Sequence, residues 1–135
     1  MKKLLLYGFL LLVFGTALWW VLSQKSSEAI QSTKAEFTME AGRLYHEFLA
    51  NEAEANEMYL NKIIRVSGEV VDFSAEGKQK AVVWLSANDR HAIKCTLDPR
   101  KEHRRRVFQK GGLVTFKGTC TGLSGDVELV NCVEE

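Results

Sequence analysis

Apolar and polar residues alternate with a period of two along much of the second half of the chain. The pattern is clearest in residues 111–132, where Val114 and Phe116 fall on one face and Thr115 falls on the other. A period of two is typical of a strand with one buried face. Residues 123–126 are small or turn-forming, and the alternation resumes after them. The segment therefore predicts a hairpin of two strands.

The same alternation predicts three earlier strands, at residues 63–73, 81–85 and 91–97. In the first of them two consecutive residues, Val70 and Val71, are both apolar. Such a break in the alternation indicates a bulge, or a strand that crosses from one face of the sheet to another.

A connection of a different kind separates the third strand from the hairpin. Residues 98–110 contain the single proline, Pro99, and predict a short helical or irregular segment that buries Val107 and Phe108. Five short strands with a connector between the third and fourth fit the five-stranded Greek-key barrel called the OB-fold. A two-sheet sandwich is the alternative, but it usually needs about seven strands. We expect the barrel to occupy residues 62–135.

Before the strands, apolar residues recur at the spacing of one face of a helix. Residues 37–61 therefore predict a helical segment that packs on the barrel. Asn51 and Glu54 have the spacing of a capping box, so a second helix is expected to start there. The apolar face of the first helix consists of residues at helical spacing, namely Phe37, Ala41, Leu44, Tyr45 and Phe48.

The N-terminus is apolar. Residues 4–22 carry no charge and follow Lys2 and Lys3. As a helix they would be about 28 Å long, close to the thickness of a bilayer core. We expect residues 1–24 to be a single transmembrane anchor and residues 25–36 to be a tether. The positive charges place the N-terminus in the cytoplasm and the barrel outside it, in the periplasm.

A cleaved secretory signal peptide is the alternative interpretation of the N-terminus. The apolar run is long for a signal peptide, it ends in Trp19 and Trp20, and it lacks a good cleavage site. No cysteine follows the run, so lipoprotein processing is not expected. The sequence therefore favours the uncleaved anchor over the signal peptide.

Composition adds little about a partner, because the net charge is only +1 and 26% of the residues are charged. The 135 residues suffice for one domain. The charged residues are distributed unevenly along the chain, since those in residues 34–58 are mainly acidic and those in residues 90–117 are mainly basic. These segments are either neighbours or solvated faces. The functional alternative is a patch that binds anions or faces a membrane.

Several motifs taken together resemble a known family. They are an Asn-Glu helix ending in Tyr59, the Val-x-Gly strand at Val66, the segment from Gly118 to Gly122, and the closing segment to Cys132. In this order they resemble the tRNA-anti-like family of bacterial OB-fold proteins, over about residues 44–132. The resemblance implies an OB-fold related to anticodon-binding domains, in a small exported or membrane-tethered protein. It carries over no catalytic residue.

The three cysteines, Cys95, Cys120 and Cys132, have no metal-binding spacing. We expect neither a metal site nor a cofactor. If the domain is exported, two of the three are expected to form a disulfide. The first candidate is Cys120 with Cys132, which would close the last hairpin. Strand alternation points Cys95 and Cys120 both inward, so that pair is the rival.

OB-folds bind ligands on the face of their second and third strands, and Trp84 and Lys94 are expected to point outward there. The sequence contains no catalytic motif, so we do not expect an enzyme. We interpret the chain as a binding or scaffold module for a protein, peptide or glycan, tethered to a membrane. A nucleic-acid-binding protein is the alternative. The candidate ligand-binding residues are Trp84, Lys94, Arg104, Arg105, Arg106 and Lys110.

Overall fold

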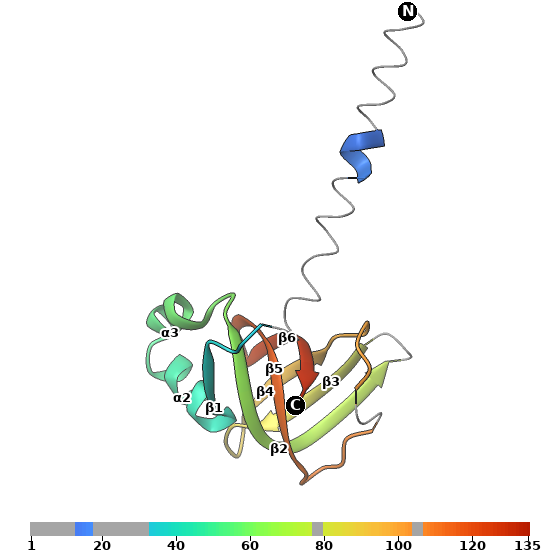
Figure 1. The fold of residues 1–135 in the computed structure, drawn as a ribbon. Coiled ribbons are helices and arrows are strands. Elements are labelled where there is room, and N and C mark those ends of the chain that lie inside the picture. Colours follow the sequence, from blue (N-terminus) through green and yellow to red (C-terminus); the bar gives the residue numbers. More distant parts are fainter. Residues whose placement is uncertain (1–12, 18–32, 77–79, 104–106) are drawn as a thin grey trace, which may run out of the picture.

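Five strands close into a barrel, and a sixth strand and two helices lie beside it (Figure 1). The computed structural model describes residues 13–17, 33–76, 80–103 and 107–135. In chain order the elements are β1 (Phe37–Glu40), α2 (Ala41–Ala50), α3 (Glu52–Tyr59), β2 (Ile63–Glu76), β3 (Lys80–Ser86), β4 (Ala92–Leu97), β5 (Leu113–Ser124) and β6 (Asp126–Glu134).

β2 closes the barrel because it pairs with different strands along its two halves. Its first half is antiparallel to β5, with Ile63 opposite Thr119. After a shift in register between Val70 and Asp72, its second half is antiparallel to β3. The order continues through β4 and β6 to β5, and β4 and β6 are parallel. The predicted five-stranded OB-fold barrel is confirmed, and the bulge lies where the sequence placed it.

Residues 37–40 form a strand, so the prediction that the helix starts at Phe37 is wrong. β1 pairs in parallel with β2, which puts Phe37 opposite Ile64 and Met39 opposite Val66. The apolar residues of this segment fit either a helical face or a strand face, because four residues are too few to separate the two periods. The β2 backbone offers hydrogen bonds to the segment, and this tertiary contact decides in favour of the strand.

The two helices follow directly. α2 packs against β2, β4 and β6 with a buried apolar face that includes Leu44, Tyr45 and Phe48. α3 begins where the capping box predicted it, since the Asn51 side chain accepts a hydrogen bond from the Glu54 backbone N–H at 3.3 Å. This bond satisfies one of the N–H groups that a helix start leaves without a partner.

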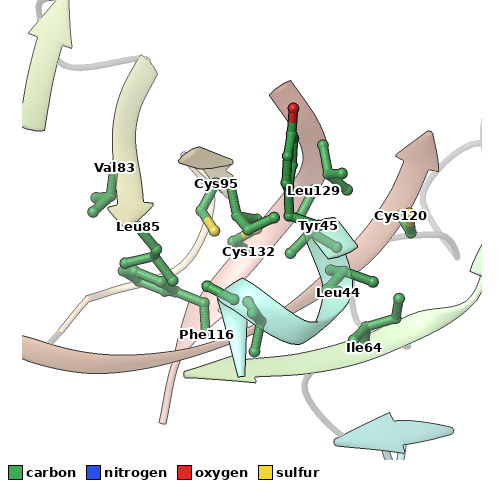
Figure 2. Close-up of a cluster of buried hydrophobic side chains, with 14 of the residues drawn as sticks. Leu44, Tyr45, Ile64, Val83, Leu85, Cys95, Phe116, Cys120, Leu129 and Cys132 are labelled. Carbon is green, nitrogen blue, oxygen red and sulfur yellow. The ribbon is translucent and has the colours of Figure 1, made fainter. Parts of the chain in front are cut away.

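The barrel interior is filled by apolar side chains from the strands (Figure 2). Val83 and Leu85 of β3, Ile93 of β4 and Phe116 of β5 have no exposed surface. They alternate with more exposed residues along their strands, as the period of two predicts for strands with one buried face. The residues between them point outward and form the outer surface of the barrel.

The connection between β4 and β5 adds one aromatic ring to the core. The described residues of the segment 98–110 form neither a helix nor a strand. The Phe108 ring is buried, with its centroid 5.4 Å from that of Phe73 and 5.5 Å from that of Phe116. Val107 was expected to be buried beside it but is 68% exposed. Of the two apolar residues expected in the core, only Phe108 enters it.

The predicted single-pass membrane topology is corrected. In the part of the chain that the structure describes, no helix has the length and hydropathy needed to cross a membrane. Residues 13–17 are helical, whereas residues 1–12 and 18–24 of the predicted anchor, and residues 25–32 of the predicted tether, lie outside the described residues. The assignment of a cytoplasmic N-terminus and a periplasmic barrel, which depended on that anchor, is therefore not retained.

Replacing Gly118 by alanine is expected to destabilise the barrel. An added Cβ would lie 2.5 Å from the Cys132 sulfur and 3.0 Å from the Val130 carbonyl oxygen, and the latter cannot move without shifting β6. We expect Gly118→Ala to lower the free energy of unfolding by about 1–3 kcal/mol, as overpacked core variants do. Urea denaturation measures this. The control is Thr119→Ala at the next position, where a loss as large as that of Gly118→Ala would contradict the argument.

The contact between Tyr59 and Glu47 is expected to make stability depend on pH at both ends of the scale. The Tyr59 hydroxyl donates to Glu47 Oε2. Burial and this bond raise the pKa of Tyr59 to about 12. The bond, with help from Arg43, outweighs burial and lowers the pKa of Glu47. Tyr59 contributes its full share to the free energy of unfolding below the pKa of an unfolded tyrosine, about 10, and this share is lost as the pH rises toward 12. Glu47 contributes its full share above the pKa of an unfolded glutamate, about 4.3, and this share is lost in acid.

Tyr59→Phe should therefore cost about 1 kcal/mol between pH 5 and pH 9. Its difference from the unsubstituted chain should shrink at pH 11 and at pH 3. Urea denaturation at the three pH values measures the difference. A difference that is the same at pH 7 and at pH 11 would show that the hydroxyl does not titrate with the pKa shift described.

Candidate functional site

A row of four side chains crosses the outer face of the barrel, and we call it the Trp84 row. Asp72 of β2 lies opposite Trp84 of β3. Trp84 lies opposite Lys94 of β4, and Lys94 lies opposite Glu128 of β6. Their neighbours along β3 and β4 point into the core, so Trp84 and Lys94 point outward, as the sequence predicted. The structure therefore brings these two predicted site residues side by side.

Two lysines, one in the Trp84 row and one beside it, each form an ion pair with a carboxylate of the row. Lys94 Nζ lies 3.0 Å from Glu128 Oε1, with about a third of each side chain exposed. Lys110, another predicted site residue, reaches the row from the connection after β4, and its Nζ lies 3.2 Å from Asp72 Oδ1. The Phe73 backbone N–H and the Lys110 ammonium both favour the charged form of Asp72 and lower the pKa of its carboxyl group. The row thus presents alternating, paired charges around one indole ring.

A second row of smaller side chains runs beside the first. Ser74 of β2 lies opposite Val82 of β3, and Val82 lies opposite Thr96 of β4. Each of these residues is two positions from a member of the Trp84 row, so it projects from the same face of the sheet. Two hydroxyl groups and one isopropyl group therefore adjoin the indole ring. The combined surface has an apolar centre with hydrogen-bonding groups around it.

The remaining predicted site residues, Arg104, Arg105 and Arg106, lie outside the described residues. The start of the same segment is held to the barrel by Asp98, whose side chain is buried. Burial alone would raise the pKa of Asp98, but hydrogen bonds from the Arg100 backbone and guanidinium groups outweigh it and lower the pKa. The Asp98 backbone N–H also donates to the Cys132 carbonyl oxygen at 3.0 Å. Arg100 is therefore occupied in fixing the connection.

Sequence reasoning missed Asp72 and Glu128, the two carboxylates of the row. The outward position of Glu128 follows from alternation, because both of its neighbours in β6 are buried. Alternation from the buried Val70 would instead turn Asp72 inward, and only the bulge turns it outward. What the sequence does not contain is the pairing of β4 with β6, which brings Glu128 next to Lys94. The position of Asp72 beside Trp84 follows from the register shift in β2, whose size alternation alone does not give.

A groove of about 690 Å³ lies elsewhere on the surface. Glu135, one of its carboxylates, is held by Lys117 and Arg65, and their hydrogen bonds and charges outweigh burial and lower its pKa. The residues around the groove include neither an aromatic side chain nor a member of the Trp84 row, which makes the outer face the stronger candidate. The groove is lined by Glu40, Ala41, Gly42, Ser67, Gly68, Ser86, Ala87, Leu113, Val114, Thr115, Glu134 and Glu135.

The three cysteines lie within the described residues, and all are buried free thiols. Burial and the neighbouring Cys95 thiol raise the pKa of Cys132. In the register of the hairpin Cys120 lies opposite Leu129. The register of the hairpin therefore does not set Cys120 opposite Cys132, and the disulfide between these two residues stays a prediction. Among the described side chains, no group of three or more histidine, cysteine or acidic residues is placed to hold a metal ion.

Comparisons with known proteins agree with this architecture. A family model described as tRNA_anti-like matches residues 1–134. None of the curated proteins is a significant match. The chain is similar to a crystal structure from Klebsiella pneumoniae subsp. pneumoniae MGH 78578, described as a candidate nucleic acid-binding lipoprotein. The TM-score is 0.60 and the identity is 19%, over 83% of this chain and 99% of that chain. At this identity the likeness shows a shared fold.

Proposed function

The chain belongs to the tRNA_anti-like family, and we propose that it is a non-catalytic OB-fold binding module whose Trp84 row takes an uncharged, extended ligand of the oligosaccharide class. The proposal rests on one observation, the pairing of Lys94 with Glu128 and of Lys110 with Asp72 around a partly exposed Trp84. OB-folds use this face of the barrel for oligosaccharides and for oligonucleotides. The charge pattern supports the first of these two ligand classes.

Paired charges disfavour a polyanion. A phosphate that approached Lys94 would lie close to Glu128, and one that approached Lys110 would lie close to Asp72. Nucleic-acid affinity depends on cations that release counterions from phosphates, and a cation already neutralised by a carboxylate contributes less to that release. Hydroxyl groups, in contrast, can donate to the carboxylates and accept from the ammonium groups without separating either pair.

The indole ring suits the apolar face of a sugar ring. Trp84 offers a flat apolar surface, and Ser74 and Thr96 of the second row add hydroxyl groups beside it. Neighbouring strands lie about 4.8 Å apart, so the row from Asp72 to Glu128 spans about 14 Å across four strands. This length fits a short oligosaccharide, and an extended peptide of similar length is the nearest competitor.

Single-stranded nucleic acid is the second candidate function. The description of the Klebsiella protein as a candidate nucleic acid-binding lipoprotein favours it. So does the position of Lys94 beside Trp84, since a cation next to an aromatic ring is the usual surface for a single strand. The two candidates differ in their dependence on salt, because only the nucleic acid complex releases counterions.

The first test compares Trp84→Ala with the unsubstituted full chain. A panel of neutral oligosaccharides is titrated by calorimetry at 50 and 300 mM salt. We expect a binder whose affinity is nearly independent of salt and falls at least about tenfold in Trp84→Ala. The control is Leu49→Ala, which removes a side chain of α2 that is 65% exposed. Binding of single-stranded DNA that weakens steeply with salt and is lost in Trp84→Ala, with no oligosaccharide bound, would establish the second candidate.

A second test removes the carboxylates of the row. The double variant Asp72→Asn, Glu128→Gln frees Lys110 and Lys94 from their partners. We expect it to bind single-stranded DNA more tightly than the unsubstituted chain. Its plot of log affinity against log salt should be steeper by about 1.4, the value for two additional phosphate contacts.

The control for this variant changes the net charge equally at another place. The double variant Glu52→Gln, Glu57→Gln alters α3, which contributes no residue to the row. It should leave the salt slope unchanged. If both double variants increase DNA binding equally, net charge rather than the pairing within the row governs the interaction.

A further inference from the structure

Two buried thiols meet inside the barrel. Cys95 lies on β4 and Cys132 on β6, and neither residue has exposed surface. The register of the parallel pair shifts between Cys95 and Leu97, which places Leu97 opposite Cys132. Burial raises the pKa of Cys132, and the neighbouring Cys95 thiol helps to raise it. In Figure 2 Cys95 and Cys132 are drawn beside each other, whereas Cys120 lies apart from them.

The position of the Cys132 sulfur is fixed from the other side as well. A Cβ on Gly118 of β5 would lie 2.5 Å from this sulfur, so the absence of a side chain at Gly118 leaves the space that the sulfur occupies. A backbone hydrogen bond also joins the two chain segments at this point, because the N–H of Asp98, directly after β4, donates to the carbonyl oxygen of Cys132 in β6. Cys132 therefore contacts the backbone of β5 on one side and the thiol of β4 on the other.

We propose that Cys95 and Cys132 form a disulfide that covalently joins β4 to β6. This pair of strands is the one in the barrel that is parallel, and β5 separates its members in the chain. β3, β4 and β6 each also pair in an antiparallel manner with a strand adjacent in sequence. The disulfide strengthens a pairing that no hairpin turn supports.

The reaction is a thiol–disulfide exchange with a low-molecular-weight disulfide such as oxidised glutathione. One thiol loses its proton, and its sulfur attacks the oxidant, forming a mixed disulfide and releasing one glutathione thiolate. The second cysteine thiolate then displaces the other glutathione. The protein loses two hydrogen atoms, and the oxidant gains them as two thiols.

The burial of both thiols sets the order of events. Burial, together with the neighbouring Cys95, raises the pKa of Cys132 well above its usual value. In the folded barrel neither thiol is exposed to an oxidant, and the Cys132 thiol is not easily deprotonated. The exchange therefore takes place while the chain folds, before β6 closes the barrel. Once formed, the disulfide is shielded from reductants in the same way.

The test counts thiols in the full chain after refolding with a mixture of reduced and oxidised glutathione. The protein is then unfolded in urea and alkylated with a maleimide, and its intact mass is measured. We expect one alkylated cysteine, Cys120, and a peptide map that joins the Cys95 and Cys132 peptides. Three alkylated thiols, or a cross-linked peptide that contains Cys120, would overturn the proposal.

Variants separate the disulfide from a general effect of oxidation. Cys120→Ala should leave no thiol to alkylate, whereas Cys95→Ala and Cys132→Ala should each leave two. Reduction should lower the midpoint of thermal unfolding by about 10–20 °C in the unsubstituted chain and in Cys120→Ala, because the closed loop is long. It should leave the midpoints of Cys95→Ala and Cys132→Ala unchanged. If one of these variants does not fold, the thiol count on the unsubstituted chain still decides the question.

Discussion

Closure of the sheet through β2 is the constraint on which the other features of the molecule depend. β2 is long enough to pair with β5 along its first half and with β3 along its second half, and the register shift between Val70 and Asp72 lets it turn from one to the other. A closed sheet has no free edge within the barrel and must place alternate side chains inside. The same closure brings β4 and β6 together, although β5 separates them in the chain.

Both the candidate binding face and the paired cysteines follow from that closure. On the outside, the β4–β6 pair sets Glu128 next to Lys94 and thereby neutralises the lysine adjacent to Trp84. On the inside, the same pair sets Cys132 next to Cys95. One strand pairing thus shapes the electrostatics of the surface and the chemistry of the core. A pair of parallel strands with distant positions in the chain costs more entropy to form than a hairpin does, and this is where a covalent link contributes most.

Much of the fold could be predicted because its determinants are local. Alternation assigned Val83 to the interior and Trp84 to the surface, and the consecutive apolar residues at Val70 and Val71 marked the bulge. The capping box at Asn51 marked a helix start. Prediction failed where the local signal was ambiguous and a tertiary contact decided, as at β1, whose four residues fit two periods and whose conformation depends on β2.

The amino-acid sequence by itself determined the number of strands in the barrel, which residues of each strand face inward, and the aromatic and basic residues that lie on the outer face. These follow from side-chain periodicity, which is a property of consecutive residues. Only the tertiary structure decided which partner each outward charge and each inward thiol receives. Register and strand order set these partners, because Lys94 with Glu128 and Cys95 with Cys132 are neighbours across β4 and β6 and not along the chain.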